Sequence, residues 1–144
     1  MKKITIINGP NLNLLGNREE EIYGKKSFDD VKKELEKIVE GKAELEYYQS
    51  NHEGEIIDKI HDCMGDSDYI IINPGALTHY SYGIYDAILA SKIKVIEVHI
   101  SNIFSREQWR GKSVISPAVI GVISGMGPDV YKMAVMYVLE QFKK

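Results

Sequence analysis

The stretch YIII, residues 69–72, decides the fold class of this sequence. Its apolar residues are continuous rather than alternating, which is typical of a strand whose two faces are both buried. The run AVIGVI, residues 118–123, has the same character. Strands of this kind belong to parallel sheets that helices cover on both sides. The two runs therefore predict an α/β protein built on a parallel sheet.

Strand and helix patterns alternate on either side of this stretch. Further short apolar runs stand at 4–7, 43–48 and 94–100, and helical spacing of apolar residues is found from Ser27 to Gly41 and over about 54–64, 80–91 and 129–142. Such alternation predicts right-handed βαβ crossovers. The expected architecture is a flavodoxin-like, doubly wound five-stranded parallel sheet with helices on both faces, forming a single domain over residues 1–144.

The helix expected over residues 80–91 is unusually apolar. Apolar or aromatic residues surround most of its circumference: Tyr80, Tyr82, Ile84, Tyr85, Ile88 and Leu89. A helix of this kind must bury more than one face. Two interpretations remain open, because the extra face can form a subunit interface or the helix can be central, with its tyrosine hydroxyls at the solvent edge.

Composition argues against several classes of function. The net charge of -3 and the pI near 5.8 do not indicate nucleic-acid binding. The single cysteine, Cys63, excludes an internal disulfide and a multi-cysteine metal site, and fits a reducing compartment. No signal peptide or membrane span is expected, since no apolar run approaches about 18 residues. A cytoplasmic location is therefore expected.

Polar residues follow three of the predicted strands. The segments are NGPNLNLLGNR (8–18), NPGALTHYS (73–81) and HISNIFSREQWR (99–110). Turn-forming residues are common at strand ends, but these segments also bring His79, His99, Arg18 and Arg110 to one edge. Ligands of open parallel α/β sheets bind at that edge. A polar small-molecule site is therefore predicted there.

Glu97 and His99 indicate acid–base chemistry within this site. They stand two residues apart on a predicted strand, so their side chains share a face. Glu97 can accept a proton from one ring nitrogen of His99 and favour the charged ring, which suits a general acid or base. A structural ion pair is the alternative. Arg110 offers a fork for a carboxylate or phosphate, and no metal-binding motif is present, so no metal is expected.

Motifs of common nucleotide-binding and hydrolytic folds are missing. The loop GPNLNLLG, residues 9–16, stands where a dinucleotide fold needs G-x-G-x-x-G, and no P-loop sequence occurs. The segment HYSYG, residues 79–83, lacks the first glycine of a serine hydrolase motif. A nucleotide-binding enzyme or a serine hydrolase is therefore not predicted.

Tyr23 stands in the charged segment NREEEIYGKK, residues 17–26. A phenol is almost wholly protonated at neutral pH, and a nearby cation makes its phenolate accessible as a base. Arg18 is close enough in sequence to supply that charge, while the glutamates at 19–21 oppose it. On these residues alone, Tyr23 is either a surface aromatic residue or a base.

The chain as a whole resembles the type II 3-dehydroquinate dehydratases. The segments GPNLNLLGNREEEIYG (9–24), NPGALTHYS (73–81), EVHISNIFSREQWR (97–110) and SGMG (124–127) are similar to the motifs of that family in the same order and at similar spacing. The resemblance implies reversible elimination of water from 3-dehydroquinate to 3-dehydroshikimate through an enolate, in the shikimate pathway, without a cofactor. A non-catalytic flavodoxin-like module that binds a small anionic ligand is the alternative.

The resemblance also implies a role for each catalytic residue. Tyr23 is expected to remove a proton from C2, and Arg18 to make its phenolate accessible and close a lid over the site. His99 is expected to protonate the departing C1 hydroxyl, with Glu97 orienting its ring. Asn11 matches an asparagine that stabilises the enolate through water.

Further positions match substrate contacts and an assembly. The expected substrate contacts are Asn73, His79, Ile100, Ser101 and Arg110. Asp86 matches an acidic residue that reaches the site of a neighbouring subunit, and the family assembles as trimers packed into dodecamers. Members often have proline where this chain has Glu20, which concerns only the stiffness and charge of the lid.

Overall fold

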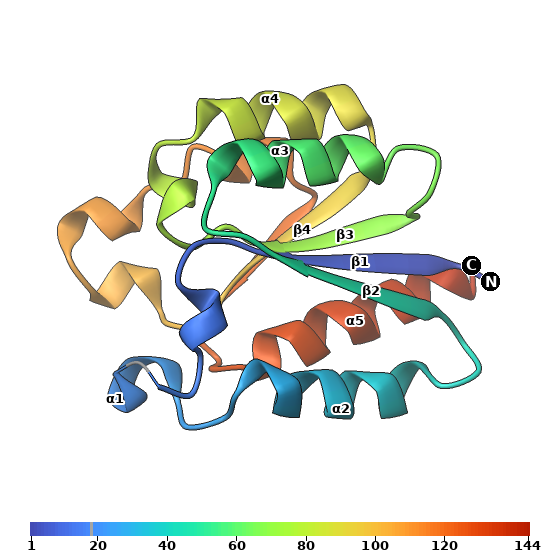
Figure 1. The fold of residues 1–144 in the computed structure, drawn as a ribbon, viewed down its shortest axis with the longest axis horizontal. Coiled ribbons are helices and arrows are strands. Elements are labelled where there is room, and N and C mark those ends of the chain that lie inside the picture. The colour runs from blue at the N-terminus through green and yellow to red at the C-terminus, as the bar shows by residue number, and fades with distance from the viewer. Residues whose placement is uncertain (18) are drawn as a thin grey trace.

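A five-stranded parallel sheet lies between two layers of helices in the computed structural model, which describes residues 1–17 and 19–144 (Figure 1). The strands are β1 (Lys3–Asn8), β2 (Glu44–Gln49), β3 (Tyr69–Asn73), β4 (Lys94–His99) and β5 (Gly121–Ser124). They are arranged in the order β2-β1-β3-β4-β5, and every neighbouring pair is parallel. The predicted flavodoxin-like sheet is confirmed.

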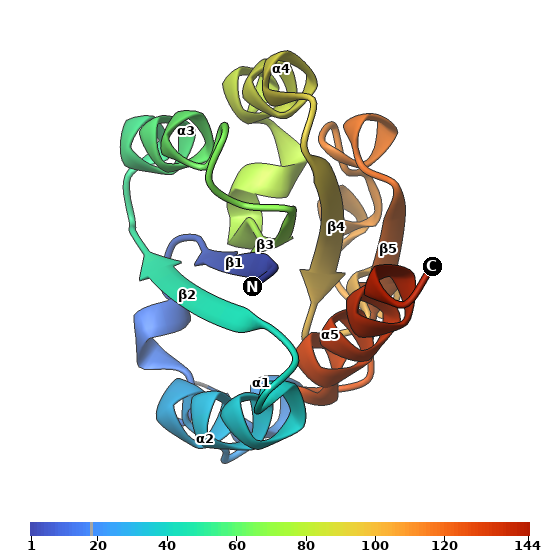
Figure 2. The same cartoon turned by 90° about the vertical axis from the view of Figure 1, so that its right-hand side faces the viewer.

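Helices cover both faces of this sheet. They are α1 (Glu20–Tyr23), α2 (Phe28–Val39), α3 (Glu53–Asp62), α4 (Tyr82–Ser91) and α5 (Asp129–Phe142). Helices α3 and α4 lie side by side on one face, and α2 and α5 lie on the other (Figures 1 and 2). Within the described ranges, no helix is long and apolar enough to cross a membrane.

Single turns of 3-10 helix shape the loops that leave the strands. They are η1 (Leu12–Leu14), η2 (Gly75–His79), η3 (Ile103–Ser105), η4 (Gln108–Gly111) and η5 (Ser116–Ala118). The last of these shortens a predicted strand, because η5 takes up the start of the 118–123 run and β5 begins only at Gly121. Likewise α4 begins at Tyr82 rather than at residue 80, since the Ser81 hydroxyl caps it by accepting from Ile84 N at 3.1 Å.

Each residue of strand β3 is buried, as the continuous YIII run requires. Ile71 packs in the core between the sheet and the layer of α2 and α5. Ile70 and Ile72 point the other way and pack in the core beneath α3 and α4. All three isoleucines have no exposed surface. Burial of such a side chain contributes about 1.5–3 kcal/mol, so this central strand ties the two cores together.

The exits of strands β1 and β3 pack closely against each other. Gly9, directly after β1, donates its N–H to the carbonyl of Asn73 at 2.8 Å. A Cβ on Gly9 would lie 2.4 Å from the Pro74 carbonyl oxygen, so only glycine fits. The exits of β1 and β3 are therefore held against each other by backbone contact.

Candidate active site

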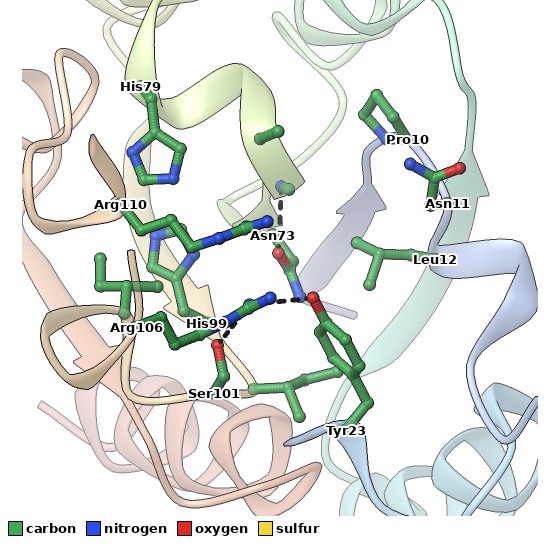
Figure 3. A pocket seen from close by; sticks show the side chains of 14 residues that line it. Pro10, Asn11, Leu12, Tyr23, Asn73, His79, His99, Ser101, Arg106 and Arg110 are labelled. Atoms are coloured by element: carbon green, nitrogen blue, oxygen red, sulfur yellow. Dashed lines mark hydrogen bonds between the residues drawn. The ribbon is translucent and has the colours of Figure 1, made fainter. Parts of the chain in front are cut away.

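A cavity of about 100 Å³ opens at the carboxyl ends of β1, β3 and β4 (Figure 3). Its lining residues are Pro10, Asn11, Leu12, Tyr23, Asn73, Gly75, Ala76, His79, His99, Ile100, Ser101, Ile103, Arg106 and Arg110. Eight of these are residues singled out in the sequence: Asn11, Tyr23, Asn73, His79, His99, Ile100, Ser101 and Arg110. The strand exits therefore meet where the parallel topology predicts.

The other three candidates are not among these lining residues. Glu97 is fully buried behind His99 rather than on the cavity wall. Asp86 is exposed on α4, away from the cavity of its own chain. Arg18 lies outside the described residues.

Strand β4 joins Glu97 and His99 in a buried hydrogen bond. His99 Nε2 contacts Glu97 Oε2, as the expected shared face requires. Burial pushes the pKa of the Glu97 carboxyl upward, but hydrogen bonds from His99, Thr78 and Ser116 outweigh it and hold that pKa below its ordinary value. The carboxylate is therefore ionised, and it accepts a hydrogen bond from the His99 ring.

His79 is held as a neutral ring beside this pair. Its Nδ1 lies 2.6 Å from the carbonyl oxygen of Lys112, and since a carbonyl only accepts, Nδ1 carries the proton. Burial lowers the pKa of His79, and the neighbouring His99 and Arg110 lower it further. Nε2 is thus left as an acceptor on the cavity side, suited to a hydroxyl group of a ligand.

Tyr23 is buried at the cavity wall, with 6% of its surface exposed. Arg106 Nη1 donates to the Tyr23 hydroxyl oxygen at 2.9 Å and to the Ser101 hydroxyl at 3.1 Å (Figure 3). The guanidinium carbon lies 5.2 Å from the centre of the Tyr23 ring. The interpretation of Tyr23 as a surface aromatic residue is therefore wrong. The charged guanidinium of Arg106 donates a hydrogen bond to its phenol oxygen.

Arg106 was not predicted as a site residue from the sequence, whereas Arg18 and Arg110 were. The signal was present, because Arg106 belongs to the same polar exit of β4 as Ser101 and Arg110. What spacing alone could not show is that η3 turns this exit back toward α1. Arg106 Nε is buried without a hydrogen-bond partner among the described residues.

Arg110 adds a second guanidinium to the cavity. It pairs through Nε with Glu107, and its guanidinium carbon lies 4.1 Å from the centre of the Trp109 ring. The two arginines on the β4 exit make the cavity favourable for an anion.

A buried network fixes the amide of Asn73. The Tyr131 hydroxyl accepts from Asn73 Nδ2 at 3.0 Å and donates to Asn8 Oδ1 at 2.6 Å. The Gly75 N–H donates to Asn73 Oδ1 at 3.2 Å. Asn11, on the opposite wall, has a left-handed backbone with φ of 70° and is tied through its N–H to Asn51 at 3.0 Å. The Asn73 amide and the Asn11 backbone are therefore both held by hydrogen bonds to other parts of the chain.

Metal ligation finds no support in residues 1–17 and 19–144, where no group of three His, Cys, Asp or Glu side chains could hold an ion. The chemistry that the cavity offers consists of a phenol beside a cation, an imidazole beside a carboxylate, and amides and guanidinium groups.

Comparison with known proteins agrees with this chemistry. A family model described as Dehydroquinase class II matches residues 2–139. The 3-dehydroquinate dehydratase of Caldicellulosiruptor bescii is 59% identical over 143 residues, covering 98% of each chain. That of Halothermothrix orenii is 50% identical over 145 residues, covering 100% of this chain and 98% of the relative.

Two solved structures are also similar to this chain along nearly all of its length. The type II dehydroquinase of Butyrivibrio crossotus superposes with a TM-score of 0.91 at 49% identity, covering 96% of this chain and 97% of that one. The type II dehydroquinase of Propionibacterium acnes superposes with a TM-score of 0.92 at 38% identity and 97% coverage of both chains. The chain belongs to the class II dehydroquinase family.

Proposed function

We propose that this site eliminates water from 3-dehydroquinate to give 3-dehydroshikimate, a step of the shikimate pathway. The dehydratase activity predicted from the sequence is confirmed by full-length matches to proteins named 3-dehydroquinate dehydratase and by the matching family. These findings do not favour the non-catalytic binding module. The observation that carries the proposal is the meeting of the Tyr23–Arg106 and His99–Glu97 pairs at one cavity.

Tyr23 acts as the base in this proposal. Its phenolate removes the proton from C2, next to the ketone, and leaves an enolate. Arg106 supports this role, because its positively charged guanidinium donates a hydrogen bond to the phenol oxygen at 2.9 Å. Arg18, from the lid, adds a second cation when the lid closes.

His99 acts as the general acid. Its Nε2 is engaged by Glu97, so Nδ1 is the nitrogen that delivers a proton to the departing C1 hydroxyl. The anionic Glu97 supports this role, because it accepts a hydrogen bond from the ring and orients it. Glu97 therefore acts through His99 and does not touch the substrate.

The other lining residues hold the substrate. Arg110 binds the substrate carboxylate, and the other substrate contacts are made by Asn73, His79, Ile100 and Ser101. Asn11 stabilises the enolate oxygen through a water molecule. Elimination next to a ketone needs one base, one acid and polar stabilisation of an oxyanion, so we propose that no cofactor takes part.

An assembly of trimers packed into a dodecamer completes the site in this proposal. Tyr82, Asp86 and Leu89 stand at i, i+4 and i+7, so they share one face of α4. Tyr82 is 64% and Leu89 50% exposed, and both flank the exposed Asp86. This face supports a subunit contact through which Asp86 reaches the neighbouring cavity.

The single cysteine supports a cytoplasmic location.

The test is the ultraviolet absorbance of the conjugated enone product after mixing the purified protein with 3-dehydroquinate. The Tyr23→Phe variant is run beside the native protein, because it keeps the ring and loses only the hydroxyl. Absorbance should rise with the native protein and not with the variant, while calorimetry shows that the variant still binds. If neither protein gives product and both bind the substrate, the chain is a binding module and the proposal fails.

A further inference from the structure

The carboxylate of Glu97 is surrounded by hydroxyl groups in addition to His99. Thr78 Oγ1, from η2, donates to Glu97 Oε2 at 2.7 Å. Ser116 Oγ, from η5, donates to Oε1 at 2.8 Å, and Ser113 Oγ donates to the same oxygen at 3.3 Å. Glu97 itself has no exposed surface. A buried anion therefore has four side-chain donors from three parts of the chain.

These hydroxyl groups are themselves held in place. Ser113 Oγ accepts from the N–H groups of Ile115 and Ser116 at 3.2 and 3.0 Å, so its own hydrogen is available to an acceptor. Thr78 has no exposed surface, and its Oγ1 lies 2.8 Å from Ser113 Oγ. Because the one hydrogen of the Thr78 hydroxyl is donated to Glu97, the hydrogen of Ser113 is shared between Thr78 Oγ1 and Glu97 Oε1. The donors are thus oriented before any ligand binds.

We propose that Thr78, Ser113 and Ser116 are positioning residues of the dehydratase, which keep Glu97 ionised and aimed at the imidazole of His99. The inference rests on the proposed function, since it concerns the acid of that reaction. An unpaired carboxylate at this depth would take up a proton. The hydrogen bond from His99 and those from the Thr78 and Ser116 hydroxyl groups together outweigh burial, so the carboxylate remains an acceptor for the His99 ring.

Two histidines among the described residues interact with Glu97. His99 lies beside it on β4, and His79 approaches from η2. Removal of a hydroxyl donor leaves both rings in place and weakens only the support of the anion. The pKa of the Glu97 carboxyl, now below its ordinary value because the hydrogen bonds outweigh burial, then rises.

A pair of substitutions at Thr78 separates the hydroxyl from its packing. Thr78→Val keeps the shape and loses the donor, whereas Thr78→Ser keeps the donor and loses a methyl group. The valine variant should lose kcat by about tenfold with KM nearly unchanged, as expected for a lost hydrogen bond to a charged group. The serine variant should retain most of kcat. The opposite order, with serine the poorer enzyme, would show that packing alone matters and would overturn the proposal.

The pH dependence gives a second readout that a packing defect would not change. At each pH, kcat of Thr78→Val is divided by kcat of the native enzyme. Groups that titrate equally in both enzymes then have no effect on the ratio. This ratio should fall as the pH is lowered from about 8 to about 5, because the carboxylate of the variant is protonated more readily. A ratio that stays constant over that range contradicts the role assigned to the hydroxyl.

Thr5→Val is the matched control. Thr5 also has no exposed surface, and its hydroxyl lies 2.5 Å from that of Ser67, away from the cavity. Its kcat and pH profile should match those of the native enzyme. If Thr78→Val does not fold, Ser116→Ala carries the same test at the other carboxylate oxygen. A native protein without turnover would refute the proposed dehydratase function. Native kcat in both Thr78→Val and Ser116→Ala would refute only the positioning role of the hydroxyl groups.

Discussion

Arg106 and Tyr23, 83 residues apart in the sequence, meet through a 2.9 Å hydrogen bond from Nη1 to the phenol oxygen. One belongs to the exit of β4 and the other to the last turn of α1. The cation is therefore supplied by a loop that directly follows a strand of the sheet. This arrangement makes Arg106 the first residue to test.

Replacement of Arg106 by methionine should lower kcat by roughly 100-fold. The variant loses the charged hydrogen bond to the phenol oxygen of Tyr23. A hydrogen bond to a charged group contributes about 1.5–3 kcal/mol, and a difference of about 1.4 kcal/mol changes a rate tenfold. Steady-state kinetics measures the loss.

Two companions make the Arg106 result interpretable. Arg106→Lys keeps a charge and should recover part of kcat, although it loses the planar guanidinium group. Lys132→Met removes a cation that pairs with Glu34 at 3.2 Å on the surface, and it should leave kcat unchanged. An Arg106→Met enzyme with native kcat would assign the activation of Tyr23 to another residue.

Tyr131→Phe should weaken both substrate binding and the fold. The lost hydroxyl leaves Asn8 Oδ1 without its 2.6 Å donor and Asn73 Nδ2 without its 3.0 Å acceptor. Unsatisfied buried polar groups cost about 1–3 kcal/mol each, and the freed amide of Asn73 should raise KM more than it lowers kcat. Urea unfolding and steady-state kinetics check the two effects. Native KM in a destabilised variant would show that Tyr131 supports only the core.

Sequence patterns were sufficient for the fold because burial on both faces leaves a direct signature. Continuous runs such as YIII identify the central strands, and the alternation with helices leaves few topologies. The ends of the helices and strands were predicted less accurately. The 118–123 run is apolar throughout, yet its first residue lies in η5 and β5 begins at Gly121, since apolarity does not distinguish a strand from a 3-10 turn.

Site residues that lie on a strand or directly after one could be predicted from the sequence. Contacts that depend on how a loop curves could not. Glu97 and His99 share a strand, so their contact follows from a spacing of two. Arg106 contacts Tyr23 only because η3 turns the β4 exit toward α1, and no local pattern encodes a meeting across 83 residues. The hydroxyl donors around Glu97 were missed for the same reason.

Glu97→Gln should show a pH-dependent loss of stability. The folded pKa of Glu97 lies below its ordinary value of 4.5, because the hydrogen bonds outweigh the effect of burial. Its ionised form therefore stabilises the fold above pH 4.5, and this contribution is lost as the pH falls through the folded value. The native enzyme should be more stable than the variant by about 2 kcal/mol at pH 7, and the gap should shrink toward pH 3. Urea unfolding at several pH values measures it, and a gap independent of pH would contradict an ionised Glu97.

Ser27→Ala tests a part of the fold away from the chemistry. The Ser27 hydroxyl accepts from Asp30 N at 3.2 Å, and the Asp30 carboxylate accepts from Ser27 N at 3.1 Å, which closes a capping box at the start of α2. Loss of the hydroxyl should cost about 1 kcal/mol of stability, with kcat unchanged. Serine to glycine at the same position should cost less. An equal loss in both variants would indicate that the cap contributes through packing.

Leu89→Asp tests the assembly proposed through α4. Leu89 is 50% exposed and shares a helix face with Asp86 and Tyr82, so a charge there should separate the subunits without disturbing the core. Light scattering should report a smaller particle, and kcat should fall with it if Asp86 serves a neighbouring cavity. Met64→Asp, at a methionine that is also 50% exposed but lies beyond the end of α3, should change neither mass nor kcat. A Leu89→Asp enzyme of native mass would remove this face from the interface, and a smaller particle with native kcat would confine Asp86 to its own subunit.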